Sequence, residues 1–148
     1  MKTYKSNLNG IRLVKEESEF KRVKITSSKD AAKYARNFFQ EDIEIYESFF
    51  MILLNRANNT DAYVKISQGG IAGTVVDLKL IAKYAIDCLA SGVIVCHNHP
   101  SGTLYPSEQD KLITEKIKNA LKLLDIKLLD HIILTKDGHF SFADECLL

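Results

Sequence analysis

The pattern of apolar and polar positions predicts a domain in which strands and helices alternate along the chain. Residues 47–55 are apolar almost throughout, so we expect a central strand that is covered on both faces. Turn residues follow, and the segment 62–67 is expected to pair with that strand as a hairpin. The β-branched run at 93–97 predicts a second buried strand, and the segments 127–135 and 139–143 predict another hairpin.

Helical spacing of apolar residues predicts three helices, at 27–40, 78–90 and around 112–124. We expect Ser27 or Ser28 to cap the first helix and Asp77 to cap the second, with a stop for the second helix at Gly92. Short strands are predicted ahead of the first helix, at Ile11–Lys15 and Phe20–Thr26. Interleaved helices and strands together with hairpins indicate an α/β (α+β) domain, with one mixed β-sheet flanked by helices.

Composition limits the class of protein without identifying it. The chain has 148 residues, of which 46% are hydrophobic and 26% charged, as in an ordinary globular domain rather than a disordered or collagen-like chain. It has no apolar run of about 18 residues and no signal-peptide pattern. Its three cysteines do not cluster, which argues against a disulfide scaffold. We therefore expect a cytoplasmic protein that does not contact a membrane. Oligomeric state is not indicated.

Charge is unevenly distributed along the chain. Residues 1–40 carry 10 Lys and Arg against 4 Asp and Glu, although the net charge of the whole chain is +1. A basic segment of this kind is typical of an arm that binds nucleic acid. An exposed edge strand whose lysines prevent pairing with other chains is favoured, because no aromatic or glycine-rich binding pattern accompanies the charge. Lys21, Arg22 and Lys24 would be the residues concerned in either case.

The candidate metal-binding residues are concentrated at the end of the strand at 93–97 and in the residues that follow it. Side chains on an extended backbone alternate between faces, so His97 and His99 point the same way at the end of a buried strand. Pro100 and Gly102 turn the chain, and Asp110 then lies in the first turn of the next helix. Two imidazoles and a carboxylate can hold one zinc ion and leave a tetrahedral position open for water.

Structural explanations exist for the same residues. The two histidines could form an exposed loop pair without a ligand. Ser107-Glu108-Gln109-Asp110 matches a capping box, in which serine caps the helix and the acid bonds back to the serine. Elsewhere, we expect Cys96 to be a buried thiol that faces away from the histidines. We expect His131 to be a structural histidine with satisfied hydrogen bonds, and the alternative is a role in supporting the metal ligands.

The longer motif resembles a known family. The string His97-Asn98-His99-Pro100-Ser101-Gly102 with Pro106-Ser107 and Asp110 resembles the RadC-like branch of the JAMM (MPN+/JAB1) metalloproteases. Further matches are Gly69-Gly70, Gly73-Thr74, 128–133 and Ser141-Phe142. The resemblance implies a cytidine-deaminase-like JAB/MPN fold over residues 27–148. A basic N-terminal segment with short strands, residues 1–26, would precede it.

The resemblance also implies roles for individual residues. His97, His99 and Asp110 would bind one zinc ion per chain, Ser107 would stabilise the tetrahedral intermediate, and a glutamate would act on the attacking water. Glu47 occupies the matching position, with Glu44 and Glu41 as the alternatives. The implied activity is hydrolysis of peptide or isopeptide bonds in a peptide or protein substrate.

Two other functions are considered beside the hydrolase. One is a non-proteolytic, DNA-repair-associated domain that binds DNA or protein, and the other is a metal-dependent nuclease. The residues ahead of the first predicted helix are too few for the helix-hairpin-helix region of RadC-type proteins, which weakens the case for duplex DNA. Nucleobase deamination is not expected, because neither His-x-Glu nor Pro-Cys-x-x-Cys occurs in the sequence.

Overall fold

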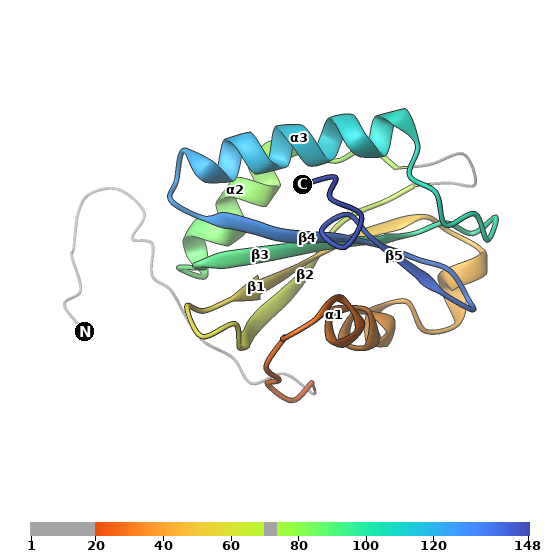
Figure 1. Ribbon diagram of the computed structural model, residues 1–148, viewed down its shortest axis with the longest axis horizontal. Coiled ribbons are helices and arrows are strands. Elements are labelled where there is room, and N and C mark those ends of the chain that lie inside the picture. The colour runs from red at the N-terminus through yellow and green to blue at the C-terminus, as the bar shows by residue number, and fades with distance from the viewer. Residues whose placement is uncertain (1–19, 70–73) are drawn as a thin grey trace, which may run out of the picture.

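A computed structural model describes residues 20–69 and 74–148 of the chain (Figure 1). The predicted strand at Ile11–Lys15 therefore lies outside the described residues. The elements are, in chain order, α1 (Ser28–Ala35), the 3₁₀ helices η1 (Arg36–Phe38) and η2 (Gln40–Glu44), β1 (Ser48–Leu54), β2 (Thr60–Gln68), α2 (Leu78–Asp87), β3 (Gly92–Asn98), α3 (Glu108–Lys122), β4 (Lys127–Leu134) and β5 (His139–Ser141).

The strands form one five-stranded mixed sheet in the order β2-β1-β3-β4-β5. β3 and β4 are parallel, and the other neighbours are antiparallel. Every residue of β1 and β3 is buried, which confirms the expectation from their continuous apolar runs. Both predicted hairpins, β1–β2 and β4–β5, are present. The fold class is thus the mixed sheet with flanking helices that the sequence predicts.

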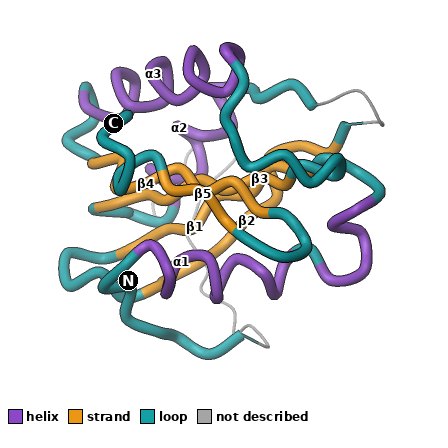
Figure 2. Tube along the Cα trace, turned by 45° about the vertical axis from the view of Figure 1, so that its right-hand side comes forward, coloured by secondary structure: helices purple, strands orange, loops and turns teal. Residues whose placement is uncertain are grey.

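Helices cover both faces of this sheet. Figure 1 shows α2 and α3 on one side and α1 on the other, and Figure 2 shows the strands as a layer between them. Alternate residues of the central strands contribute to two separate cores, because successive side chains point to opposite faces. Phe50, Ile52 and Ile94 pack toward α1. Phe49, Met51 and Val95 pack toward α2 and α3, and this second face also carries His97.

The segment 20–26 differs from its prediction as a strand. Only Lys24 forms a bridge, with Asn59, and the backbone bonds to the β1–β2 turn are few: Ile25 N–H to Asn58 O, and Thr60 N–H to Val23 O. The segment thus contacts the β1–β2 turn and the first residues of β2 without forming a ladder. The boundary at residue 26 between an N-terminal segment and the domain stays a prediction.

The helix ends also differ from those predicted. Ser27 caps α1 as expected, but the α-helix ends at Ala35 and continues as 3₁₀ turns. Asp77 caps α2 as expected, whereas Gly92 does not end it. The chain leaves α2 through Leu89, whose φ is 53°, and Gly92 opens β3 instead. A Cβ at Gly92 would lie 2.7 Å from Leu129 Cδ1, so this glycine permits close packing of β3 against β4.

None of the helices in the described ranges, 20–69 and 74–148, is long and apolar enough to cross a bilayer.

Candidate metal centre

The site begins where β3 reaches the edge of the sheet. His97 is the penultimate residue of β3 and His99 follows its last residue, so both rings lie on the face covered by α2 and α3. Cys96 points to the other face, where its thiol donates to the backbone carbonyl of Phe50 at 3.8 Å. Burial raises the pKa of the Cys96 thiol. The expectation that Cys96 is buried away from the histidines is confirmed.

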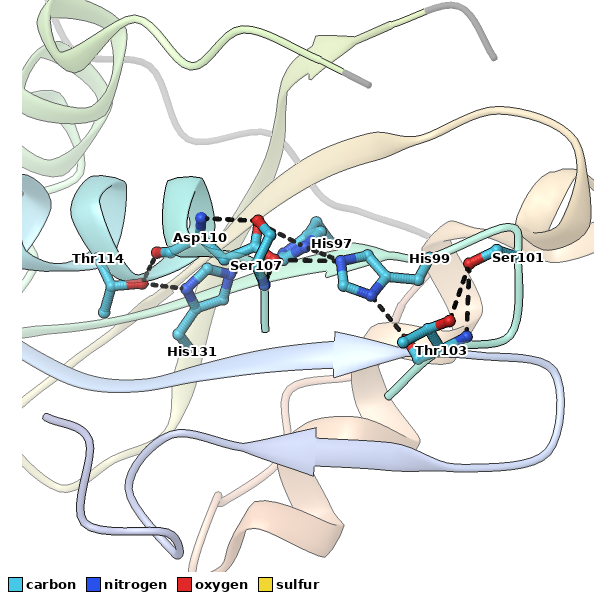
Figure 3. Close-up of polar contacts among 8 residues, drawn as sticks. All are labelled: His97, His99, Ser101, Thr103, Ser107, Asp110, Thr114 and His131. Atoms are coloured by element: carbon cyan, nitrogen blue, oxygen red, sulfur yellow. Dashed lines mark hydrogen bonds and ion pairs between the residues drawn. The ribbon is translucent and has the colours of Figure 1, made fainter. Parts of the chain in front are cut away.

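Asp110 brings a carboxylate to the two imidazoles from the first turn of α3 (Figure 3). Its Oδ1 lies 3.2 Å from Nε2 of His97, and its Oδ2 lies 3.2 Å from Nε2 of His99. The two Nε2 atoms are 2.9 Å apart. One ligand atom from each residue lies within 4.8 Å of the others, so this cluster could hold a metal ion. His97 is buried, whereas His99 and Asp110 retain some exposure to solvent.

The predicted capping box is also present, and it involves the same aspartate. Ser107 Oγ accepts a hydrogen bond from the backbone N–H of Asp110 at 3.0 Å, and the backbone N–H of Ser107 donates to Asp110 Oδ2 at 2.7 Å. The capping box holds the carboxylate in one orientation and leaves Oδ1 directed at His97. Its hydrogen bonds therefore fix the geometry of the cluster, and the structural and the metal-ligand explanations are compatible.

His99 is held by the loop that follows it. Its Nδ1 lies 2.7 Å from the backbone carbonyl of Thr103, and a carbonyl oxygen can only accept a hydrogen bond. Nδ1 therefore carries a hydrogen, and the lone pair of the neutral ring is on Nε2, which faces the cluster. Gly102, with a φ of 86°, makes the turn that returns Thr103 to the ring.

The electrostatics of the cluster favour a cation among these groups. Burial tends to raise the pKa of Asp110, but its contacts with the imidazoles of His97 and His99 outweigh burial and hold the pKa well below its usual range. Burial tends to lower the pKa of His99, but hydrogen bonds to Asp110 and to the Thr103 carbonyl leave that pKa above its ordinary value. The carboxylate thus stays charged, which is the form that binds a metal ion.

Glu47 lies beside this cluster. It directly precedes β1 and is half-buried. The antiparallel register pairs Phe49, two residues after Glu47, with His97, two residues before His99. The Glu47 charge contributes to the raised pKa of His99, after burial and the hydrogen bonds of that ring. The alternative Glu44 is exposed and pairs with Lys136 at 3.4 Å, and Glu41 is exposed on η2.

Asn98, between the two histidines, connects β3 to the segment that carries Glu47. Its side chain is fully buried on the opposite face. Oδ1 accepts from the backbone N–H of Ser48 at 2.8 Å, and Nδ2 donates to the carbonyls of Ile43 and Tyr46, each at 2.7 Å. The backbone on both sides of Glu47 is therefore bonded to the strand that carries the histidines.

We expect Asn98→Ala to lower the free energy of unfolding by about 3 kcal/mol, because it leaves three backbone groups without their partner. Urea unfolding followed by circular dichroism measures this. Asn55→Ala is the matched control, since Asn55 accepts from the backbone N–H groups of Ala57 and Asn59 in an exposed turn at the far end of β1. A loss at Asn98 no larger than the loss at Asn55 would contradict the expectation.

Two further residues adjoin the site: His131, which the sequence singles out as a structural histidine or a residue supporting the metal ligands, and Thr114, which the sequence does not single out. His131 on β4 is fully buried, and its Nε2 lies 2.7 Å from Nδ1 of His97. Its Nδ1 lies 2.6 Å from the hydroxyl of Thr114, a buried residue of α3. Burial keeps the pKa of His131 well below its ordinary value. The reading of His131 as a satisfied histidine is correct, but its partner is a candidate ligand, and only the parallel pairing of β3 with β4 brings them together.

A surface pocket of about 270 Å³ adjoins the loop after His99. Three short segments line it: the loop after β3, the β4–β5 turn, and the end of η2. Its residues are Glu44, Pro100, Ser101, Gly102, Leu104, Thr135, Lys136, Asp137 and Gly138. The pocket therefore carries both acidic and basic side chains next to the cluster.

The predicted basic segment is described only in part. Lys21, Arg22 and Lys24 are exposed, and the residues before Phe20 lie outside the described range. Arg22 forms an ion pair with Asp61 and also donates to the carbonyl of Thr60 at 3.3 Å. At least one of the three basic side chains thus contributes to holding its segment against β2.

Comparisons with known proteins agree with the fold and the motif. The family model described as RadC-like JAB domain matches residues 25–147. A UPF0758 protein of Flavobacterium johnsoniae is 46% identical over 129 residues, which cover 87% of this chain and 56% of the relative. A UPF0758 protein of Porphyromonas gingivalis is 45% identical over 103 residues, covering 69% and 45%. The UPF0758 protein YfjY of Escherichia coli is 40% identical over 102 residues, covering 69% and 64%. The chain therefore spans about half the length of the curated relatives it matches.

Proposed function

This chain belongs to the RadC-like JAB domain family, and from that premise we propose that it is a zinc-dependent metallohydrolase of the JAMM type. Its substrate would be a peptide or protein, cleaved at a peptide or isopeptide bond. The observation that carries the proposal is the convergence of His97, His99 and Asp110 on one point beside Glu47.

The donor set suits zinc. Atoms about 2.0–2.1 Å from a tetrahedral zinc ion lie about 3.3 Å from one another. The two Nε2 atoms are 2.9 Å apart, each lies 3.2 Å from a different oxygen of Asp110, and with one ligand atom per residue all three lie within 4.8 Å of one another, so side-chain shifts would accommodate the ion. Three protein ligands are the number that catalytic zinc sites use, with the remaining position left for the reaction. The partial exposure of His99 and Asp110 provides access from solvent.

A bound zinc ion supplies Lewis acidity, which polarises a carbonyl group and makes water a better nucleophile near neutral pH. The chain's own residues would transfer the proton and stabilise the developing negative charge. A carboxylate oxygen of Glu47 would take the proton from the attacking water and later deliver it to the leaving amine. The Ser107 oxygen already accepts the N–H of Asp110, so its hydroxyl hydrogen is the group that would be donated to the developing oxyanion.

The pocket after His99 is the candidate position for substrate residues next to the scissile bond. It is formed by the same loop that connects His99 to Ser107, so a chain bound there would lie beside the cluster. Its lining includes Glu44, Lys136 and Asp137, which favours polar rather than large apolar substrate side chains.

We expect the purified protein to contain about one zinc ion per chain and to lose peptide hydrolysis when a chelator removes it. Inductively coupled plasma mass spectrometry gives the metal content, and a library of fluorogenic peptides with internal quenchers reports hydrolysis. Adding zinc to the chelated protein should restore the rate. Adding magnesium should not, because two imidazoles and one carboxylate suit zinc better.

A protein that binds no transition metal under these conditions would contradict the proposal at its first step. A protein that binds zinc but cleaves no peptide in the library, and whose metal changes its affinity for another macromolecule, would favour a non-proteolytic binding domain. Binding of duplex DNA that weakens steeply with salt and depends on Lys21 and Lys24 is the specific form of that result for nucleic acid.

A further inference from the structure

The orientation of the Thr114 hydroxyl can be assigned from its partners. Thr114 is one turn after Asp110 on α3, and its Oγ1 donates to the backbone carbonyl of Asp110 at 2.5 Å. A threonine hydroxyl has one hydrogen, and the carbonyl can only accept it. Thr114 Oγ1 also lies 2.6 Å from Nδ1 of His131. Because the hydroxyl hydrogen is already used, Nδ1 of His131 must carry the hydrogen of that second bond (Figure 3).

The hydrogen on Nδ1 of His131 in turn determines which nitrogen of His97 carries a hydrogen. Its ring is fully buried and stacks on Phe142, with centroids 4.6 Å apart, so the uncharged form is the one that this environment supports. A neutral ring with its hydrogen on Nδ1 has a lone pair on Nε2. That atom is 2.7 Å from Nδ1 of His97, which must therefore be the donor. Nε2 of His97 then carries a lone pair and faces Asp110 and His99.

We propose that Thr114 and His131 are positioning residues that set the tautomer of His97, so that its Nε2 lone pair is presented to a metal ion. The inference rests on the metal site of the proposed function. With the opposite tautomer, an N–H of His97 would point into the cluster and no coordination could form without rearrangement. Ligating histidines commonly donate their second N–H to a fixed partner, and a loss of that partner weakens metal binding.

Both histidines of the cluster carry their hydrogen on Nδ1, but the hydrogen-bond acceptors that hold it there differ. His99 donates directly to the Thr103 carbonyl, whereas His97 donates to His131, which donates to Thr114. The chain from His97 ends at the backbone carbonyl of Asp110, whose carboxylate is the third candidate ligand. Asp110, in the first turn of α3, therefore contributes a candidate ligand through its carboxylate and helps to orient His97 through its backbone carbonyl.

Imidazole ¹⁵N spectra of the metal-free protein test the tautomer directly. Long-range ¹H–¹⁵N correlations distinguish a ring with hydrogen on Nδ1 from one with hydrogen on Nε2. We expect hydrogen on Nδ1 in both His97 and His131 of the wild-type protein. A His131 ring that carries its hydrogen on Nε2 would overturn the inference. This measurement requires neither bound metal nor catalysis, so it remains decisive if the proposed function fails.

Measurements of zinc affinity test whether the Thr114 hydroxyl contributes to metal binding through His131 and His97. Thr114→Val removes the hydroxyl with little change of shape and is expected to weaken zinc binding by about 10–100-fold, measured by competition with a chromophoric chelator. Thr114→Ser retains the hydroxyl and is expected to bind zinc like the wild type. Thr60→Val is the matched control, because Thr60 is a buried threonine whose hydroxyl accepts the N–H of Val23 at the opposite end of β1.

Wild-type zinc affinity in Thr114→Val would overturn the inference, and so would equal losses in Thr114→Val and Thr60→Val. If the wild-type protein itself binds no zinc, the proposed function is wrong, and the ¹⁵N spectra alone decide the tautomer.

Discussion

Replacing Asp110 with alanine is expected to reduce the zinc content from about one ion per chain to near zero and peptide hydrolysis to the background rate. The carboxylate is the only anionic group of the cluster that the structure describes, and its pKa is held low by the histidines despite burial. Two neutral imidazoles that remain would bind a divalent ion far more weakly. Mass spectrometry of the metal and the fluorogenic peptide assay give the two measurements.

Loss of the helix cap has to be separated from loss of the ligand. Asp110→Asn retains an oxygen that can accept the N–H of Ser107, so it should keep the capping box and still lose zinc. Asp77→Ala removes an exposed cap from α2, where Asp77 accepts from Lys79 N–H at 2.8 Å. It should cost about 1 kcal/mol of stability and leave zinc content unchanged. Full zinc occupancy in Asp110→Asn would show that this carboxylate is not a ligand.

Glu47→Gln is expected to lower the turnover number by about 10²–10⁴-fold while zinc remains bound. The amide has nearly the shape of the carboxylate but cannot accept a proton from water. The charge of Glu47 acts on His99, but Glu47 is not a member of the ligand cluster, so metal content should not change. Steady-state kinetics on the peptide that the wild type cleaves fastest, together with metal analysis, measure both effects.

Glu44 and Glu41 provide the controls for this assignment. Both are exposed on η2, and Glu44 is paired with Lys136, so Glu44→Gln and Glu41→Gln should retain most of the wild-type turnover. Full activity in Glu47→Gln, with a large loss in one of these two variants, would transfer the role of the base to that residue.

The parts of the fold that were predictable have strong local signals. The runs at 47–55 and 93–97 carry no polar face, which requires cover on both sides, and β1 and β3 are the two fully buried strands of the sheet. Helix caps at Ser27, Asp77 and Ser107 were readable because each precedes an apolar helical pattern.

Features that depend on packing between distant segments were not predictable. Gly92 has the same sequence signature as a helix stop, and only the approach of Leu129 from β4 explains why a glycine opens β3. The segment 20–26 contains apolar residues like those of a short strand, but it forms a single bridge, from Lys24 to Asn59 in the β1–β2 turn. Local patterns record which face of a segment is apolar, and they do not record which neighbour covers it.

The candidate site also has some features that were predictable from local sequence and others that depend on the tertiary structure. The sequence by itself determined the two histidines on one face and the aspartate in the first turn of the next helix, because β alternation and a helix cap operate within a few residues. Only the tertiary structure decided that the charge of Glu47 acts on His99, that Asn98 holds the backbone around Glu47, and that His131 and Thr114 contact His97 and each other. These contacts join residues 17 to 55 positions apart, and they exist because β3 pairs with β1 on one side and with β4 on the other.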